Sequence, residues 1–209
     1  MRIDFTTTLY LLPGIIIGFT FHEFAHAKTA VLLGDDTPRL QGRTSLNPLV
    51  HIDIIGFILI LIAGFGWAKP VQINPLNFKK KRRDDILVSI AGPLMNIFLA
   101  CVFLLLARIA YSMPLNIFEP ATYSILVNIF QYGAYINVVL CVFNLLPIPP
   151  LDGSHILFGL INLKNTKLFY QFSRYGIFVL LALIITNLLH KIIIPPIYII
   201  FNFLSGIFF

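Results

Sequence analysis

Residues 8–33 read TLYLLPGIIIGFTFHEFAHAKTAVLL, and this stretch decides the class of fold. The run exceeds the roughly 20 apolar residues with which a helix crosses a bilayer core of about 30 Å. It nevertheless carries His22, Glu23 and His26 in an H-E-x-x-H pattern. Ionisable groups at membrane depth are costly unless they pair with one another or bind a ligand. We therefore expect a membrane helix whose polar side chains share a ligand.

The composition of the whole chain agrees with a membrane protein. Of 209 residues, 58% are hydrophobic and 11% are charged, whereas about a quarter of a typical soluble domain is charged. An ordinary soluble domain is therefore excluded. The net charge of +6 comes from cations in short gaps between apolar runs, which is typical of cytosolic loops. We interpret this positive charge as a determinant of membrane orientation and not as a nucleic-acid-binding surface. We therefore expect a lipid bilayer and no nucleic acid as partner.

Seven apolar segments could lie in the membrane. We predict an all-α polytopic membrane protein with about five to six transmembrane or re-entrant helices and a catalytic core of three spans. We expect one membrane-embedded domain over 1–209, with a core over about 8–163 and C-terminal accessory helices over about 168–209. The strong candidates are 8–33, 86–111, 123–146 and 172–190, and the weaker ones are 52–67, 154–163 and 192–209, the last broken by Pro195 and Pro196.

Three segments leave alternatives open. Residues 52–67 could cross the membrane or re-enter it, and we favour a re-entrant segment because about 16 residues with three glycines are marginal for a crossing. The loops at 38–50 and 69–73 alternate enough to form short β-strands that could add an extended substrate segment. For both loops, a plain loop at the membrane surface is the favoured alternative.

The cluster Lys79–Arg83 predicts the orientation of the chain. Five consecutive cations beside a span rarely cross a membrane, so this loop should be cytosolic. The span at 86–111 then leaves the cytosol and the span at 123–146 returns to it. This order places residues 147–155 at the cytosolic side.

The H-E-x-x-H pattern indicates a metal site. Residues four apart lie on one face of a helix, so His22 and His26 can reach a single zinc ion, and Glu23 can act on a water beside it. A catalytic zinc usually takes three protein ligands. Asp152, which follows a strong span and a proline-rich turn, is the best candidate for the third. A helix-capping Asp is the alternative for this residue.

Together, two motifs resemble the site-2 protease family of intramembrane zinc metalloproteases. Its members pair H-E-x-x-H with N-x-x-P-x-x-x-L-D-G, and residues 144–153 read NLLPIPPLDG. The segments Ala91–Asn96 (AGPLMN) and Gly66–Val71 (GWAKPV) extend the match. The resemblance covers about 14–163 and indicates the compact branch without PDZ or CBS domains.

The resemblance implies that one Zn2+ per chain is held by His22, His26 and Asp152, with Glu23 as the catalytic general base. The substrates would be transmembrane proteins cleaved within or near the bilayer, in regulated intramembrane proteolysis. The protein would be a multi-pass component of a prokaryotic plasma membrane, with its active site toward the cytosol.

The resemblance also assigns a role to Asn144, and helix geometry adds Asn137 as a second candidate. Asn144 would bind the substrate backbone or the developing oxyanion. Asn137 lies two helical turns earlier, where it could assist or simply bridge packed helices.

Two other functions remain open from the sequence. A membrane metal-ion transporter also places His, Asp and Asn at membrane depth, although it needs further ligands along a path. A noncatalytic relative could bind membrane proteins, although every motif residue is intact here. A Glu23→Gln variant separates these functions, since it should retain zinc and lose proteolysis.

Overall fold

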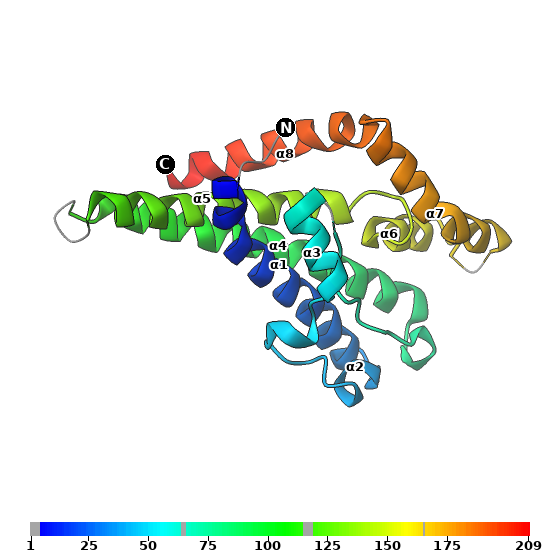
Figure 1. The fold of residues 1–209 in the computed structure, drawn as a ribbon. Helices are drawn as coiled ribbons and strands as arrows, with labels where there is room; N and C mark the ends of the chain where they lie inside the picture. The colour runs from blue at the N-terminus through cyan, green and yellow to red at the C-terminus, as the bar shows by residue number, and fades with distance from the viewer. Residues whose placement is uncertain (1–4, 64–65, 115–118, 165) are drawn as a thin grey trace.

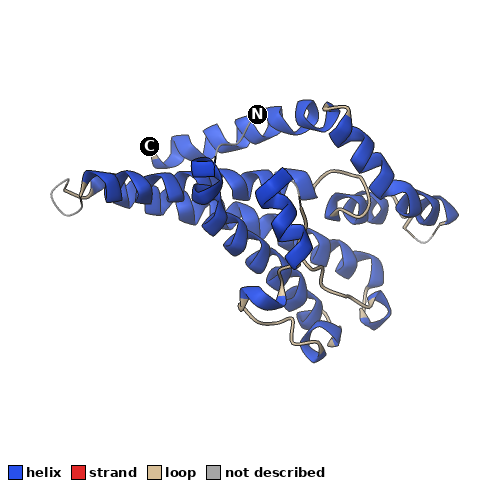
Figure 2. Ribbon diagram, viewed as in Figure 1, coloured by secondary structure: helices blue, strands red, loops and turns tan. Residues whose placement is uncertain are grey.

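The described part of the chain is mostly helical. The structure is a computed structural model, and it describes residues 5–63, 66–114, 119–164 and 166–209. Figure 2 shows helices joined by loops and, within these ranges, no strand. The helices are α1 (Phe5–Leu32), α2 (Thr37–Leu40), η1 (Pro48–Val50), α3 (Ile54–Ala63), η2 (Pro75–Asn77), α4 (Lys81–Ser112), α5 (Pro120–Asn144), α6 (Asp152–Leu160), α7 (Lys167–Ile185) and α8 (Leu188–Phe208).

Three long helices form the core of the fold. α1 packs on both α4 and α5, and α4 and α5 pack along each other; in Figure 1, α1 crosses this pair and α8 lies along α5. The main apolar cluster joins α4, α5 and α8 through residues such as Leu104, Val138 and Ile197. The predicted core of three spans corresponds to α1, α4 and α5.

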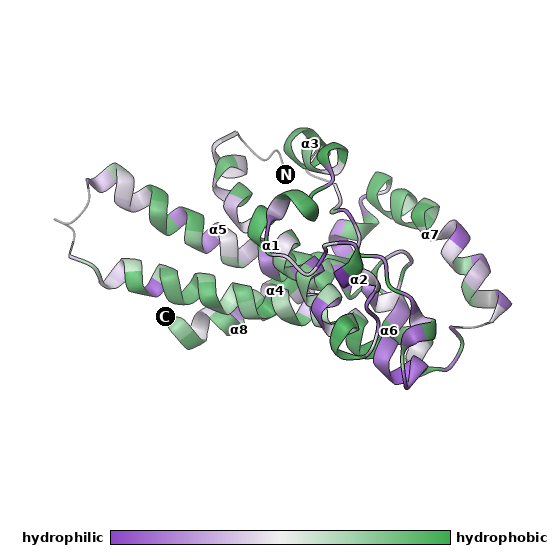
Figure 3. Cartoon of the chain, turned by 90° about the horizontal axis from the view of Figure 1, so that it is seen from below, coloured by the Kyte–Doolittle hydropathy of each residue, from purple (hydrophilic) through white to green (hydrophobic). Residues whose placement is uncertain are grey.

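In the described part of the chain, four helices are long and apolar enough to cross a membrane: α1 from Thr6, α4, α5 and α8. In Figure 3, hydrophobic residues cover much of α4, α5 and α8, and hydrophilic residues gather toward the end that holds α2 and α6. The prediction of an all-α polytopic membrane fold is confirmed.

The predicted boundary between the last two helices was wrong. We expected a span at 172–190 and a broken segment after it, yet α7 ends at Ile185 and α8 continues through Pro195 and Pro196. The break falls at Asn187, which has a left-handed backbone with φ of 56°. Membrane helices tolerate interior prolines because neighbouring groups satisfy the freed carbonyls.

The two ends of the segment that contains α3 lie beside each other. α3 has 10 residues, which span about 15 Å at 1.5 Å per residue, half of a bilayer core. Ile52 forms an antiparallel bridge with Ala68, and the backbone N–H of Lys69 donates to the carbonyl of His51. Because its two ends meet, this segment fits the re-entrant interpretation.

The short strands suggested for 38–50 and 69–73 do not form. The isolated bridge between Ile52 and Ala68 is the sole β-pairing in the described ranges. Backbone amides in and directly after the 69–73 loop donate to side chains. The N–H of Val71 donates to the carboxylate of Glu23, and that of Asn74 donates to the carboxylate of Asp35. These side chains satisfy the amides that a partner strand would otherwise occupy.

Candidate metal centre

Three possible metal-ligand atoms from two distant parts of the sequence lie close together. Nε2 of His22 lies 3.0 Å from Nε2 of His26, and each lies 3.2 Å from Oδ2 of Asp152. α1 supplies both histidines, one helical turn apart, and Asp152 is the first residue of α6. The fold thus joins the H-E-x-x-H motif to the N-x-x-P-x-x-x-L-D-G motif.

The spacing of these atoms suits a tetrahedral zinc ion. Zinc binds imidazole nitrogen and carboxylate oxygen at about 2.0–2.1 Å, which separates neighbouring tetrahedral ligands by roughly 3.3 Å. The observed separations of 3.0 and 3.2 Å are close to this value. Within the described ranges, His22, His26 and Asp152 are the one group of three or more His, Cys, Asp or Glu residues with metal-binding spacing.

The hydrogen bonds of the two imidazoles leave their Nε2 lone pairs for a cation. Nδ1 of His26 lies 2.7 Å from the carbonyl oxygen of Val88, and Nδ1 of His22 lies 2.6 Å from Oδ1 of Asn96. Both partners are acceptors, so each Nδ1 carries the proton and donates. Oδ2 of Asp152 is buried and has no hydrogen-bond partner. Two lone pairs and a carboxylate oxygen facing one another fit a metal ion.

The backbone of α4 leaves room beside these atoms. A Cβ atom at Gly92 would lie 2.4 Å from Nε2 of His26 and 2.6 Å from Nε2 of His22. Any side chain at this position would collide with the metal-binding nitrogens. Gly92 belongs to the AGPLMN segment, whose residue types alone do not reveal this close contact.

Electrostatics at Asp152 also favour a charged carboxylate. Burial raises its pKa, yet positive charge beside it, on the two adjacent imidazoles or on a bound cation in their place, holds the pKa below its usual range. Its position at the first residue of α6 adds the favourable N-terminal end of the helix dipole. Asp152 is therefore ionised, as a metal ligand must be.

Glu23 is held beside the three ligands without joining them. Its side chain is buried, and Oε2 accepts a hydrogen bond of 2.9 Å from the backbone N–H of Val71. The segment that carries Val71 is anchored by Arg43, which donates to the carbonyls of Val50 and Lys69. The loop after α3 thus fixes the position of the predicted general base.

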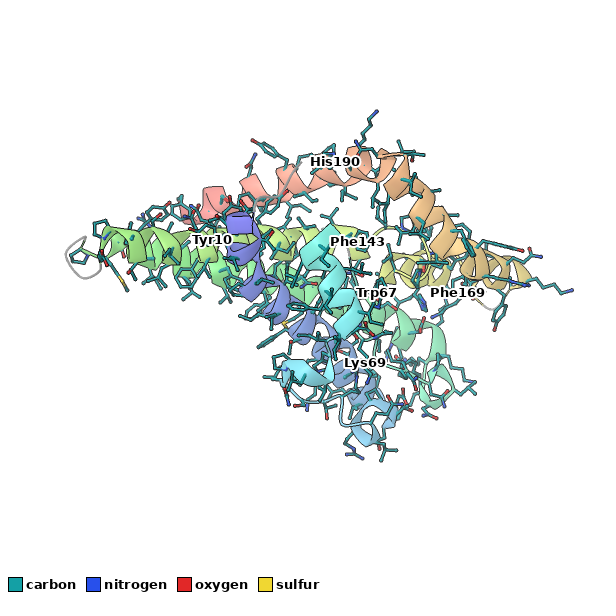
Figure 4. All side chains as sticks on the ribbon, viewed as in Figure 1. Tyr10, Trp67, Lys69, Phe143, Phe169 and His190 are labelled. Atoms are coloured by element: carbon teal, nitrogen blue, oxygen red, sulfur yellow. The ribbon has the colours of Figure 1, made fainter. Side chains whose placement is uncertain are left out.

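A cavity of about 1070 Å³ opens beside the centre. Its wall includes His22, Glu23, His26 and Asp152, together with residues from α4, α5, α7 and the segment after α3. Figure 4 labels three aromatic residues of this wall: Trp67, Phe143 and Phe169. The space is large enough for an extended peptide segment of several residues.

The two predicted asparagines lie in different surroundings. Asn144 lines the cavity, and its amide donates to the carbonyl of Leu140 in its own helix. Asn137 is fully buried, and its amide donates to the carbonyls of Gly14 and Gly133. Asn137 bridges packed helices, which was the alternative interpretation of this residue, and it is not part of the cavity wall.

Comparison with known proteins agrees with this geometry. The profile described as Peptidase family M50 matches residues 109–187. A relative from Bacillus subtilis, named "Putative zinc metalloprotease YwhC", is 46% identical over 182 residues, which cover 86% of this chain and 81% of the relative. The chain belongs to peptidase family M50. The predicted family and enzyme class, a zinc metalloprotease, are therefore confirmed, and so is zinc as the cofactor.

Two more distant relatives of this M50 peptidase carry the same class of name. A protein of Mycolicibacterium smegmatis, Rip2, is 29% identical over 204 residues, covering 95% of this chain and 75% of the relative. A protein of Methanocaldococcus jannaschii is 31% identical over 156 residues, covering 74% of this chain and 73% of the relative. No solved structure matches significantly. Family and apolar helices together make the M50 peptidase a multi-pass integral membrane protein.

Proposed function

We propose that this M50 peptidase hydrolyses peptide bonds of membrane-spanning proteins within or near the bilayer, with zinc held by His22, His26 and Asp152. One observation carries the proposal. The three proposed ligand atoms lie together, and Glu23 lines the same cavity, whose wall includes residues of three apolar helices long enough to cross a membrane. A peptide that enters this cavity lies among these apolar helices and beside the three proposed ligands.

Each residue has a chemical task in this reaction. A zinc ion at the three ligands would polarise the scissile carbonyl and make water a better nucleophile near neutral pH. Glu23 accepts the proton of the attacking water and later delivers it to the leaving amine. The second hydrogen of the Asn144 amide is available to the substrate carbonyl, because its first donates to Leu140.

A transmembrane substrate must unwind before it is cut, because the carbonyl in an intact helix is already hydrogen-bonded. Segment 66–76 contributes several residues to the cavity wall and is not part of a helix up to Ile73. The prolines of the turn at 145–151 have no N–H, and its other N–H groups donate to nearby carbonyls. This turn can therefore offer carbonyls to an unwound stretch of substrate, and segment 66–76 can offer the backbone groups that no side chain engages. Cleavage of such substrates is the chemistry of regulated intramembrane proteolysis.

We further propose that the site faces the cytosol of a prokaryotic cell across its plasma membrane. Arg82, in the basic cluster, donates to the carbonyls of Gly159 and Leu160 in α6, and Lys164 pairs with Asp85. These contacts bring the basic cluster and the helix that begins with Asp152 to the same end of the bundle. The positive-inside rule places that end in the cytosol.

The test uses purified protein in liposomes with a single-span substrate. Wild type should cleave it, whereas Glu23→Gln should keep one zinc per chain and lose about 10²–10⁴-fold in rate, the usual contribution of a general base. An unfolded soluble protein serves as the comparison substrate. Cleavage of the soluble protein alone would contradict the membrane substrate, and zinc transport that persists in Glu23→Gln without any proteolysis would favour a transporter.

A further inference from the structure

A chain of two buried amides connects the proposed zinc ligand His22 to the backbones of α1 and α5. Oδ1 of Asn96 accepts from Nδ1 of His22 at 2.6 Å, and Nδ2 of Asn96 donates to Oδ1 of Asn137 at 3.0 Å. Both asparagines are fully buried. A buried amide that takes part in such a chain has few alternative partners.

Backbone carbonyls fix the direction of every hydrogen bond that links these two amides to their partners. Nδ2 of Asn137 donates to the carbonyls of Gly14 and Gly133, and Nδ2 of Asn96 donates to that of Gly18. A backbone carbonyl can only accept, so neither amide can flip without facing oxygen against oxygen. Oδ1 of Asn96 is therefore held toward His22 as an acceptor.

The close crossing of α1 and α5 makes this chain possible. A Cβ atom at Gly14 would lie 2.6 Å from Cα of Gly133, and one at Gly18 would lie 2.9 Å from Oδ1 of Asn137. Gly14 and Gly18 form a small-xxx-small pair, which lets membrane helices approach closely. The approach brings the polar side chain of Asn137 over α1, within reach of its carbonyls.

We propose that Asn96 is a positioning residue that fixes the tautomer and ring orientation of His22, with Asn137 holding Asn96 in place. The inference rests on the proposed zinc site. With the proton held on Nδ1, His22 presents its Nε2 lone pair toward Nε2 of His26 and Oδ2 of Asp152. Without that acceptor, His22 can rotate or place its proton on Nε2, where it opposes a metal ion. Hydrogen-bond partners of ligating histidines typically contribute 10–100-fold in metal affinity.

The test compares Asn96→Leu with Asn96→Asp in the full-length protein in detergent. Leucine is similar in size and removes the acceptor, so zinc affinity, measured by competition with a chelator, should fall 10–100-fold. Aspartate keeps an acceptor toward His22, and as a neutral acid it still donates one hydrogen bond toward Gly18 or Asn137. Zinc affinity should therefore stay well above that of Asn96→Leu, even if the melting temperature of the zinc-free protein falls. Zinc affinity should fall less in Asn137→Leu than in Asn96→Leu, because Asn96 still donates to the carbonyl of Gly18 when Asn137 is replaced.

Asn202→Leu is the control, since Asn202 is exposed on α8; it should change zinc affinity by less than twofold. Equal zinc affinity in wild type and a folded Asn96→Leu would overturn the inference, as would a loss in Asn96→Asp as large as that in Asn96→Leu. A wild-type protein that binds no zinc would instead refute the proposed metal centre itself. The two failures are therefore distinguishable.

Discussion

The backbone of Gly92 faces Nε2 of His26 so closely that a Cβ atom built on it would lie 2.4 Å from that nitrogen. Only hydrogen fits at this position of α4. The contact joins α4 to the H-E-x-x-H face of α1 at the point where both imidazole nitrogens meet Asp152. Space for a metal ion thus depends on a missing side chain as well as on the three ligands.

Gly92→Ala should reduce zinc affinity at least tenfold, because the new methyl group displaces one or both imidazoles from the positions that bind the ion. A competition assay with a zinc chelator measures this change. Gly206→Ala is the matched control, since a Cβ atom at this α8 position meets nothing within 4 Å. Full zinc affinity in Gly92→Ala would show that the ion binds away from these nitrogens.

Removal of a single ligand should abolish stable zinc binding. His22→Ala and Asp152→Ala each leave two ligands, and we expect affinity to fall by about two orders of magnitude or more. His190→Ala removes a histidine that is exposed on α8 and should keep its zinc. Metal analysis of the purified variants measures the stoichiometry. Zinc retained in both ligand variants and lost in His190→Ala would contradict the assignment.

Asn144→Ala should slow cleavage without loss of zinc. If its amide stabilises the developing oxyanion, kcat should fall by about 10²–10³, the usual effect of removing one such donor. The melting temperature should change little, because the one hydrogen bond recorded for this side chain lies within its own helix. A rise in KM with unchanged kcat would instead assign Asn144 to substrate binding alone.

Asp35 should make the stability of the protein depend on pH. Burial raises its pKa, but hydrogen bonds from Thr37, Asn74 and Asn77 outweigh burial, so the folded pKa lies below the usual value of 3.8. The stabilisation is complete above about pH 4 and is lost as pH falls through the folded pKa, because the unfolded chain takes up its proton first.

Asp35→Asn should therefore lower the free energy of unfolding by about 2 kcal/mol at pH 7. Its melting temperature should fall less than that of wild type between pH 7 and pH 3. Asp36→Asn is the neighbouring control, since Asp36 forms an exposed pair with Arg39, and such pairs contribute about 0–1 kcal/mol. Parallel pH curves for wild type and Asp35→Asn would refute this role.

The membrane fold and the metal cluster could be predicted because each follows from strong local patterns. Apolar length defines α1, α4 and α5, and the four-residue spacing of His22 and His26 requires one helix face. Asp152 was the best candidate for the third ligand because it follows a strong span and a proline-rich turn, and the resemblance supported this choice. The break at Asn187 was missed because the adjacent apolar run hides it, whereas Pro195 and Pro196 suggested a break that does not occur, since α8 continues through both.

The supporting contacts of the centre could not be predicted from residue types. The carbonyl of Val88 and the N–H of Val71 are backbone groups, and every residue has a carbonyl. The pairing of Asn96 with His22 spans 74 residues and depends on how α4 packs on α1. The AGPLMN segment was the one available signal, and it indicated a family without indicating these contacts.

The most direct test of the central claim is anomalous diffraction at the zinc edge from crystals of Glu23→Gln, which should bind zinc without turning over substrate. The account predicts one strong peak at about 2.0–2.2 Å from Nε2 of His22, Nε2 of His26 and Oδ2 of Asp152. A peak elsewhere in the protein, or one bound by the histidines with Asp152 beyond coordination distance, would contradict the account.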